Sequence, residues 1–321
     1  MDHSETHLLK GIKTQKHYDV SWVDVESPNH EIFERLENEY HLHPVHLNES
    51  IQKVQHNQVE REENYLFFVL HVPLFNEQMN KIIVNQVGVF LGRDFLITIR
   101  KGRSPFITDL FSECQHEQKP REEYFKKGSS YLLYGIIARL LGDISDMTDS
   151  IEMELDAIED LVFEDANSDA QRIGKVRHEI IKLRRVIGPK RYVLQDLADQ
   201  IDTFSGRSVA KHYSNNTKTI NKLWEVIEEA KETVEVYKDA DFTTSTEQTN
   251  RILAVLTIIF TFTIPITVVG TLYGMNVPLP GGNQTGAWTF IGRYTTFEVL
   301  LSLSVAMAVG MYLYFRNKKW F

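Results

Sequence analysis

Two long apolar runs dominate the pattern of residues in the last quarter of the chain. The run 252–273 reads ILAVLTIIFTFTIPITVVGTLY, and the run 294–315 is interrupted only by Glu298 near its start. At a rise of about 1.5 Å per residue, a helix of either length crosses the hydrocarbon core of a bilayer, about 30 Å thick. A membrane helix tolerates an internal proline such as Pro265. Because the link between the runs is short, the pattern predicts a transmembrane hairpin, with two buried helices of a soluble core as the alternative.

The first 127 residues carry shorter patterns of both kinds. Strand-like stretches, rich in β-branched and aromatic residues, lie at 17–23, 65–72, 81–91 and 95–100. The last two flank Gly92-Arg93-Asp94, which fits a hairpin turn. Helical periodicity is present at 31–40 and 105–117. This alternation predicts a mixed α/β domain.

A helical pattern then continues to the first apolar run. Apolar residues recur at Ile151, Leu155, Ile158 and Val162, and acids fill much of the remaining surface. A second helical stretch covers 168–201, where Gly188-Pro189 predicts a kink or a break. A third begins near Thr217 and has no Pro or Gly before Arg251, so we expect it to run directly into the apolar segment.

These patterns together predict an α+β membrane protein with six consecutive parts. We expect a cytosolic α/β domain at 1–127, a helical stalk at 128–251, a first transmembrane helix at 252–273, an external loop at 274–293, a second transmembrane helix at 294–315 and a basic tail at 316–321.

Charge is distributed very unevenly along the 321 residues. Of the 35 Lys and Arg only four follow Arg251, and of the 44 Asp and Glu only Glu298 does, so residues 1–251 carry a net charge of −12. Such an acidic chain is a poor candidate for binding nucleic acid, which requires clustered cations. The single cysteine, Cys114, excludes an internal disulfide and indicates a reducing compartment. The first residues, MDHSETHLLK, contain no apolar run, so we expect no cleaved signal peptide.

The basic residues at the ends of the apolar runs predict the orientation in the cell membrane. Arg316, Lys318 and Lys319 follow the second run, whereas the loop offers only Arg293. Because positive residues stay on the cytoplasmic side, we expect both termini there.

The first apolar run ends in Tyr273-Gly274-Met275-Asn276. A glycine here can end the helix and expose backbone carbonyls, and the asparagine adds an amide oxygen. Since Mg²⁺ gives up its water reluctantly, neutral oxygens from several copies of the chain suit the hydrated ion. By itself the tripeptide is equally consistent with a simple helix cap.

In its setting the motif resembles the CorA family of divalent-cation channels. The resemblance extends to YLLYGIIARLLGDISDMTDSIEMELDAIED (131–160), KLRRVIGPKRYVL (182–194) and HPVHLNESIQKVQ (43–55), and to the terminal FRNKKWF. It implies a homopentamer with a central pore lined by the first transmembrane helix, admitting Mg²⁺ as substrate, with Gly274, Met275 and Asn276 selecting the ion. Apart from Mg²⁺, which is also the implied regulatory ligand, no cofactor is expected.

The resemblance also assigns pore positions along the preceding helix. Asn250 matches a pore-lining asparagine, Leu253 and Leu256 match a hydrophobic constriction, Thr267 matches a polar pore residue and Asp239 matches an acid of the upper funnel. Read directly from the sequence, a spaced stripe falls on one helical face at Asn250, Leu253, Thr257, Ile264, Thr267 and Thr271. The alternative for each threonine is helix packing.

Two features of the chain depart from the family's pattern. Members are regulated by cytosolic Mg²⁺ at acids between subunits; Glu49 matches one acid, but the opposing position falls near the neutral Asn215 and Asn216. The acids between Glu152 and Glu164 are alternative candidates, or simply a solvated helix face. The external loop also lacks an acid after the motif. Transport of Zn²⁺ or Co²⁺ therefore stays open, as does a non-conducting, membrane-anchored cation sensor.

A histidine-rich stretch of the chain offers one further kind of chemistry. His41, His43 and His46 form H-x-H-x-x-H, which suggests a zinc or nickel site, with surface or structural histidines as the alternative because Pro44 interrupts the stretch. The sequence contains no Walker-type phosphate loop, HExxH or nucleophile elbow. We therefore expect neither an ATP-driven pump nor an enzyme.

Overall fold

The computed structural model describes residues 11–52, 58–76, 78–79, 81–163, 170–205, 209–282 and 285–318. The chain divides into two compact units, 1–239 and 240–321. Glu164, Lys319 and the segment 53–55, which entered the sequence predictions, lie outside the described residues.

A six-stranded sheet forms the centre of the first unit. Its strands are β1 (Ile12–His17), β2 (Val20–Val25), β3 (Glu60–Arg61), β4 (Tyr65–Asn76), β5 (Lys81–Gly92) and β6 (Phe95–Arg100). Their order is β1-β2-β6-β5-β4-β3, and all neighbours are antiparallel except β2 and β6. The hairpin predicted at Gly92 is confirmed: Leu91 pairs with Leu96, and a Cβ at Gly92 would lie 2.2 Å from the Phe95 ring.

The strand expected at 17–23 is wrong in its bounds. Residues 12–17 and 20–25 form two antiparallel strands, and Tyr18, with φ of 55°, lies in the turn between them. Strand β1, with the sequence IKTQKH, lies at the edge of the sheet and has only one strongly apolar residue. Such a strand shows little of the periodicity that identifies strands from sequence.

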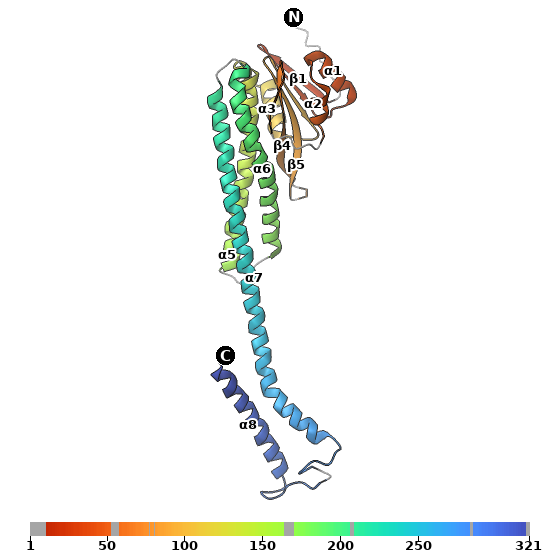
Figure 1. The fold of residues 1–321 in the computed structure, drawn as a ribbon, viewed down its shortest axis with the longest axis vertical. Helices are drawn as coiled ribbons and strands as arrows, with labels where there is room; N and C mark the ends of the chain where they lie inside the picture. The colour runs from red at the N-terminus through yellow and green to blue at the C-terminus, as the bar shows by residue number, and fades with distance from the viewer. Residues whose placement is uncertain are drawn as a thin grey trace. The chain divides into compact units, whose positions relative to one another are not determined.

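Helices cover both faces of this sheet (Figure 1). On one side lie α1 (His30–Tyr40) and α2 (Pro44–Glu49), and on the other lies α3 (Pro105–His116), followed by α4 (Gln118–Phe125). Alternate strand residues point to opposite faces. One face therefore joins α1 and α2 in a hydrophobic core formed by Val23, Val25, Ile32, Leu36, Leu42, Leu47, Tyr65, Phe67, Val69, Phe90, Phe95, Ile97 and Ile99.

The opposite face of the sheet buries a polar network. Arg100 donates from Nη2 to Asp24 Oδ2 at 2.8 Å and from Nε to Oδ1 at 3.1 Å, and Thr98 donates to the same Oδ1 at 2.9 Å. Trp22 donates from Nε1 to Thr98 Oγ1, and its ring packs on Phe111 of α3. Both charged side chains are almost completely buried. The network therefore fixes β2 against β6 in the one parallel pair of the sheet.

Three long helices follow, α5 (Ser129–Phe163), α6 (Ala170–Ser205) and α7 (Ala210–Gly274). The predicted apolar stripe from Ile151 to Val162 is buried, as expected of a helix in a bundle. Tyr213 of α7 donates to Ser130 O at 2.7 Å, and Arg184 and Arg177 of α6 pair with Glu228 and Glu235 of α7.

The second and third helical stretches are both helices, with one correction. Of the kink or break predicted at Gly188-Pro189, the break is absent, because α6 continues through Pro189. The continuous helix expected from the third stretch is confirmed, since α7 has no interruption before Gly274. Its C-terminal part and α8 (Thr295–Asn317) are each long and apolar enough to cross a membrane.

Cys114 lies on α3 and its side chain is fully buried. Burial, together with the negative charge of Glu113, raises the pKa of its thiol to about 11. At about pH 8 only about one thousandth of the thiol is then ionised, and the thiolate is the reactive form. We predict that iodoacetamide labels the native protein about a hundredfold more slowly than the urea-unfolded protein, as measured by mass spectrometry. Equal rates would contradict the burial of this side chain.

Candidate functional site

The Gly-Met-Asn motif lies where α7 ends. Gly274 is the last residue of the helix, and Met275 N donates to Leu272 O at 3.2 Å. Gly274, Met275 and Asn276 are all exposed, and a Cβ placed on Gly274 would meet no atom within 4 Å. The last carbonyls of a helix have no partner within it. The motif therefore brings neutral backbone oxygens and one amide side chain together on an accessible helix end.

Hydrogen bonds tie the following loop to this helix end. Tyr273 donates from its hydroxyl to Pro280 O at 2.9 Å, and Trp288 N donates to Thr296 Oγ1 of α8 at 2.9 Å. Gly281 has a φ of 74°, and a Cβ there would lie 2.8 Å from the Trp288 ring. These contacts hold the residues after the motif near the ends of α7 and α8.

The predicted pore residues share one face of α7. At about 100° per residue, Asn250, Leu253, Leu256 and Thr267 fall within about one third of the helix circumference. All four are exposed, Leu253 by 54% and Leu256 by 43%. The hydroxyl of Thr267 donates back to Thr263 O at 2.8 Å. The structure thus aligns these side chains along the helix.

A different face of α7 is buried against α8. Thr261 and Pro265 are buried within this unit, as are Ser304 and Ala308 of α8. The rings of Phe262 and Tyr312 also approach each other, with centroids 6.3 Å apart. With the same 100° per residue, the centre of this buried face lies about 100° around the helix from the centre of the pore stripe, by which we mean the face that carries Asn250, Leu253, Leu256 and Thr267. Within one chain, therefore, α8 leaves the stripe uncovered.

Asp239 lies before the apolar run on α7, and its side chain is 75% exposed. Lys238 Nζ is 3.3 Å from Asp239 Oδ1 and 2.6 Å from Glu235 Oε2. Hydrogen bonds from Lys238 and Arg177 hold the pKa of Glu235 at about 2. The acid predicted for the funnel therefore lies beside a cation that partly offsets its charge.

The acids between Glu152 and Asp160 belong in part to contacts between helices. Glu154 accepts hydrogen bonds from Arg172 of α6, and Glu159 accepts one from the Tyr237 hydroxyl at 2.7 Å. Asn216 is buried, and its Nδ2 has no hydrogen-bond partner among the described residues, whereas Asn215 is exposed. Glu154 and Glu159 therefore contribute to contacts between the helices.

Among the described residues, the three histidines of H-x-H-x-x-H do not form one set of ligands. His41 is exposed and ends α1 in the left-handed conformation, with φ of 54°. His43 is the N-cap of α2, and its Nδ1 accepts a hydrogen bond from Val45 N at 3.2 Å. His46 is 95% buried and is hydrogen-bonded to Tyr65 and Glu60, and its ring centroid lies 5.5 Å from that of His43. The alternative predicted from the sequence, a structural histidine, therefore applies to His43, which caps α2.

Instead, His46 meets two acids. Among the residues that the structure describes, His46, Glu49 and Glu60 each place a potential ligand atom within 4.8 Å of the others. His46 and Glu49 are three residues apart on α2, a spacing that puts both on one side of a helix. Glu60 comes from β3 and was missed, because only the folded sheet brings this residue to α2.

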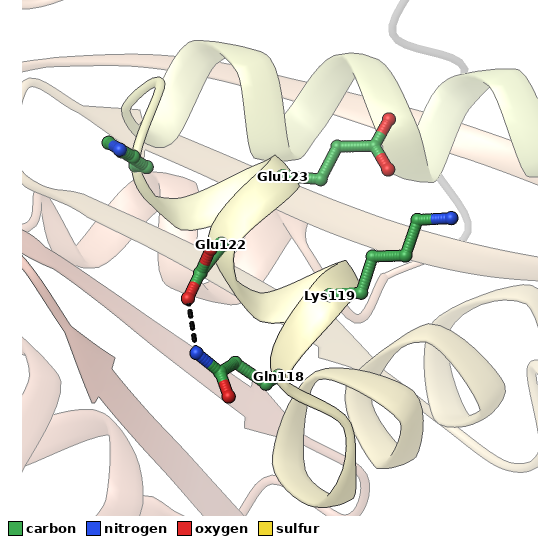
Figure 2. Close-up of a pocket in the computed structure, with 5 residues that line it drawn as sticks. Gln118, Lys119, Glu122 and Glu123 are labelled. Atoms are coloured by element: carbon green, nitrogen blue, oxygen red, sulfur yellow. Dashed lines mark hydrogen bonds between the residues drawn. The ribbon is translucent and has the colours of Figure 1, made fainter.

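A hollow of about 530 Å³ beside α4 carries no such chemistry. Figure 2 shows Gln118, Lys119, Glu122 and Glu123 along this helix, with Gln118 donating to Glu122 at 2.6 Å. The lining consists of residues of α4 and of Lys126, which follows this helix. Its two lysines, Lys119 and Lys126, balance the charges of its two glutamates. The hollow is a surface of balanced charge.

A known protein family and several known proteins are similar in sequence to almost the entire chain. Residues 18–318 match the family described as CorA-like Mg²⁺ transporter protein. The cobalt/magnesium transport protein CorA of Thermotoga maritima is 24% identical over 303 residues, covering 94% of this chain and 83% of that protein. The putative metal ion transporter YfjQ of Bacillus subtilis is 25% identical, covering 99% and 96%.

Solved structures match the fold at lower identity. The complete structure of the CorA magnesium transporter from Methanocaldococcus jannaschii superposes with a TM-score of 0.75 at 20% identity, covering 96% of this chain and 93% of that one. The predicted fold class, an α/β domain followed by long helices and two apolar C-terminal helices, is thereby confirmed.

Proposed function

This chain belongs to the family of CorA-like Mg²⁺ transporter proteins, a family of transporters rather than enzymes, and from that premise we propose that it is a homopentameric channel for Mg²⁺ influx. The observation that carries the proposal is the exposed Gly-Met-Asn end of α7, in line with a stripe of side chains that α8 leaves uncovered. Gly274, Met275 and Asn276 would select the ion.

The uncovered stripe calls for further copies of the chain. A single helix cannot enclose an ion path, and polar side chains such as Asn250 are unfavourable against lipid. Closed cyclic symmetry lets the same face of each copy turn toward one axis. Five copies follow the family resemblance, with α8 placed outside α7 and in contact with the bilayer.

Selection by this motif would act on the hydrated cation. Mg²⁺ holds its water in a near-octahedral shell, and neutral oxygens can accept hydrogen bonds from that shell without replacing it. Asn276 and the carbonyls near Gly274 supply such oxygens in each copy.

The driving force would be the membrane potential. A potential of 100 mV, negative inside, contributes about 2.3 kcal/mol per charge, so a divalent ion gains about twice that without ATP. Both termini would lie in the cytoplasm, as the positions of Arg251 and Arg316 favour.

Closure would use the apolar residues of the same stripe. Rings of Leu253 and Leu256 can exclude water from a narrow pore, and so stop ions, without a separate gate domain. Thr267 would line the pore between this constriction and the motif, and Asp239 the funnel before it. Metal bound near Glu49 on the cytosolic side would favour the closed state.

Flux into liposomes tests this proposal directly. Full-length protein is reconstituted, and Mg²⁺- and Zn²⁺-sensitive dyes report entry under an imposed potential, negative inside. We expect Mg²⁺ entry well above that of protein-free liposomes, suppressed by internal Mg²⁺. Entry of Zn²⁺ or Co²⁺ without Mg²⁺ would favour transport of those ions, which the altered external loop leaves open. Absence of flux from intact oligomers would favour a membrane-anchored cation sensor.

A further inference from the structure

The cluster of His46, Glu49 and Glu60 has the arrangement of a metal site within one subunit. His46 is 5% exposed, and the two glutamates are partly exposed, so the cluster is shielded on one side and reachable on the other. Donor atoms around a transition-metal ion at about 2.1 Å lie about 3 to 4 Å from one another. The three ligand atoms, within 4.8 Å of one another, need only small side-chain movements to reach that spacing.

The imidazole of His46 is held in a fixed direction. Its Nδ1 is hydrogen-bonded to the Tyr65 hydroxyl at 2.8 Å, and that hydroxyl also accepts from His43 N at 3.0 Å. The ring stacks on Phe67, with centroids 4.6 Å apart and planes 16° apart. Nε2 consequently faces Glu60, whose Oε2 is 2.9 Å away. An outer hydrogen bond that orients a ligating histidine in this way is a regular feature of metal sites.

We propose that His46, Glu49 and Glu60 bind a borderline transition-metal dication, of the class of Zn²⁺ or Co²⁺, in each subunit. The ion would lie between His46 Nε2 and Glu60, in place of their hydrogen bond, with water completing its coordination. Two carboxylates balance its double positive charge. The imidazole sets the preference, since nitrogen ligands suit Zn²⁺ and Co²⁺, whereas Mg²⁺ favours an all-oxygen octahedron.

Where Zn²⁺ or Co²⁺ is present, this site would let the cytosolic domain respond to those ions in addition to Mg²⁺. A metal bound here links α2 to β3, and through β3 to the edge of the sheet. Glu49 would then act together with ligands of its own subunit, without an acid from a neighbour. The effect on conduction rests on the proposed channel function, whereas the binding itself does not.

Cobalt titration of the full-length protein in detergent tests the site. Metal-free protein is titrated with Co²⁺ in excess Mg²⁺, and visible absorption reports nitrogen ligation. We expect one such Co²⁺ per chain, displaced by Zn²⁺. His46→Gln and Glu60→Gln each remove a direct ligand and should weaken this binding by more than the roughly 10- to 100-fold that loss of an outer-shell partner costs. Glu60→Gln also serves as the folding check: Glu60 is partly exposed on an edge strand, so this variant should keep the metal-free melting temperature of the parent.

Two neighbouring substitutions provide matched controls. His41→Asn and Glu63→Gln alter exposed residues beside the cluster, and asparagine tolerates the left-handed backbone at position 41. Both should bind Co²⁺ as the parent does. The proposal is overturned if folded parent protein binds no Co²⁺ with nitrogen ligation, or if His46→Gln and Glu60→Gln retain parental affinity. Because the titration measures metal binding and not transport, its outcome does not depend on whether the protein conducts ions.

Discussion

Replacing Asn276 with alanine should abolish Mg²⁺ uptake into liposomes while leaving the oligomer intact. The residue is exposed directly beyond the end of α7, so the substitution removes an amide and creates no cavity. A hydrogen bond to a charged partner is worth about 1.5 to 3 kcal/mol, and the amide is lost from every copy around the axis. Occupancy of the site should therefore fall by far more than tenfold. Dye-reported flux measures the loss, and size-exclusion chromatography with light scattering measures the assembly.

Val277→Ala is the matched control, because Val277 is the next exposed residue of the same loop. It should retain parental flux, since a valine side chain offers no oxygen to a hydrated cation. Parental Mg²⁺ flux through Asn276→Ala would show that the amide does not select the ion. Simultaneous loss of flux and of oligomers would assign Asn276 to assembly instead.

The membrane helices were predictable because the bilayer constrains them strongly. Lipid offers no hydrogen-bond partners, so a spanning segment must be helical, long and nearly free of charge. The run 252–273 meets all three conditions, and α7 ends one residue after it, at Gly274. The hairpin at Gly92 was predictable for a different reason: Gly92-Arg93-Asp94 separates two strand-like stretches, and the backbone there passes too close to Phe95 for a side chain.

Features that depend on tertiary contacts were harder to predict. At Pro189 the local sequence argues for a break, but burial of Ile187 and Val193 on either side is consistent with packing that keeps α6 continuous. Glu60 gave no local signal at all, because its proximity to His46 arises only when β3 joins the edge of β4.

The histidine motif illustrates the same limit within a few residues. A spacing of H-x-H-x-x-H treats the three imidazoles as equivalent ligands. The chain instead ends α1 at His41 and caps α2 with His43, which leaves His46 alone to turn inward. Glu49, identified through the family resemblance, and His46, identified through the motif, belong to one cluster. The sequence thus contained two of its three members without the means to connect them.

A second large effect is expected in the first unit, where Asp24→Asn should lower the free energy of unfolding by about 3 to 5 kcal/mol. Asp24 and Arg100 are 1% and 0% exposed, and the carboxylate accepts from both Arg100 and Thr98. Asparagine keeps the shape but leaves the guanidinium as a buried charge without its counterion, and removing one partner of a buried pair carries this cost. Urea unfolding of the full-length protein, followed by alkylation of Cys114, measures the change.

Glu26→Gln separates the buried charge from charge in general. Glu26 is also close to Arg100, at 3.4 Å from Nη1, but its side chain is 39% exposed, and pairs open to solvent contribute about 1 kcal/mol or less. This variant should therefore unfold within about 1 kcal/mol of the parent. If Asp24→Asn had as small an effect as Glu26→Gln, the parallel pairing of β2 with β6 would owe its stability to the surrounding apolar side chains. The buried charge of Arg100 would then be stabilised by Glu26 and by the Gly102 carbonyl, which accepts a hydrogen bond from Nη1 at 2.7 Å.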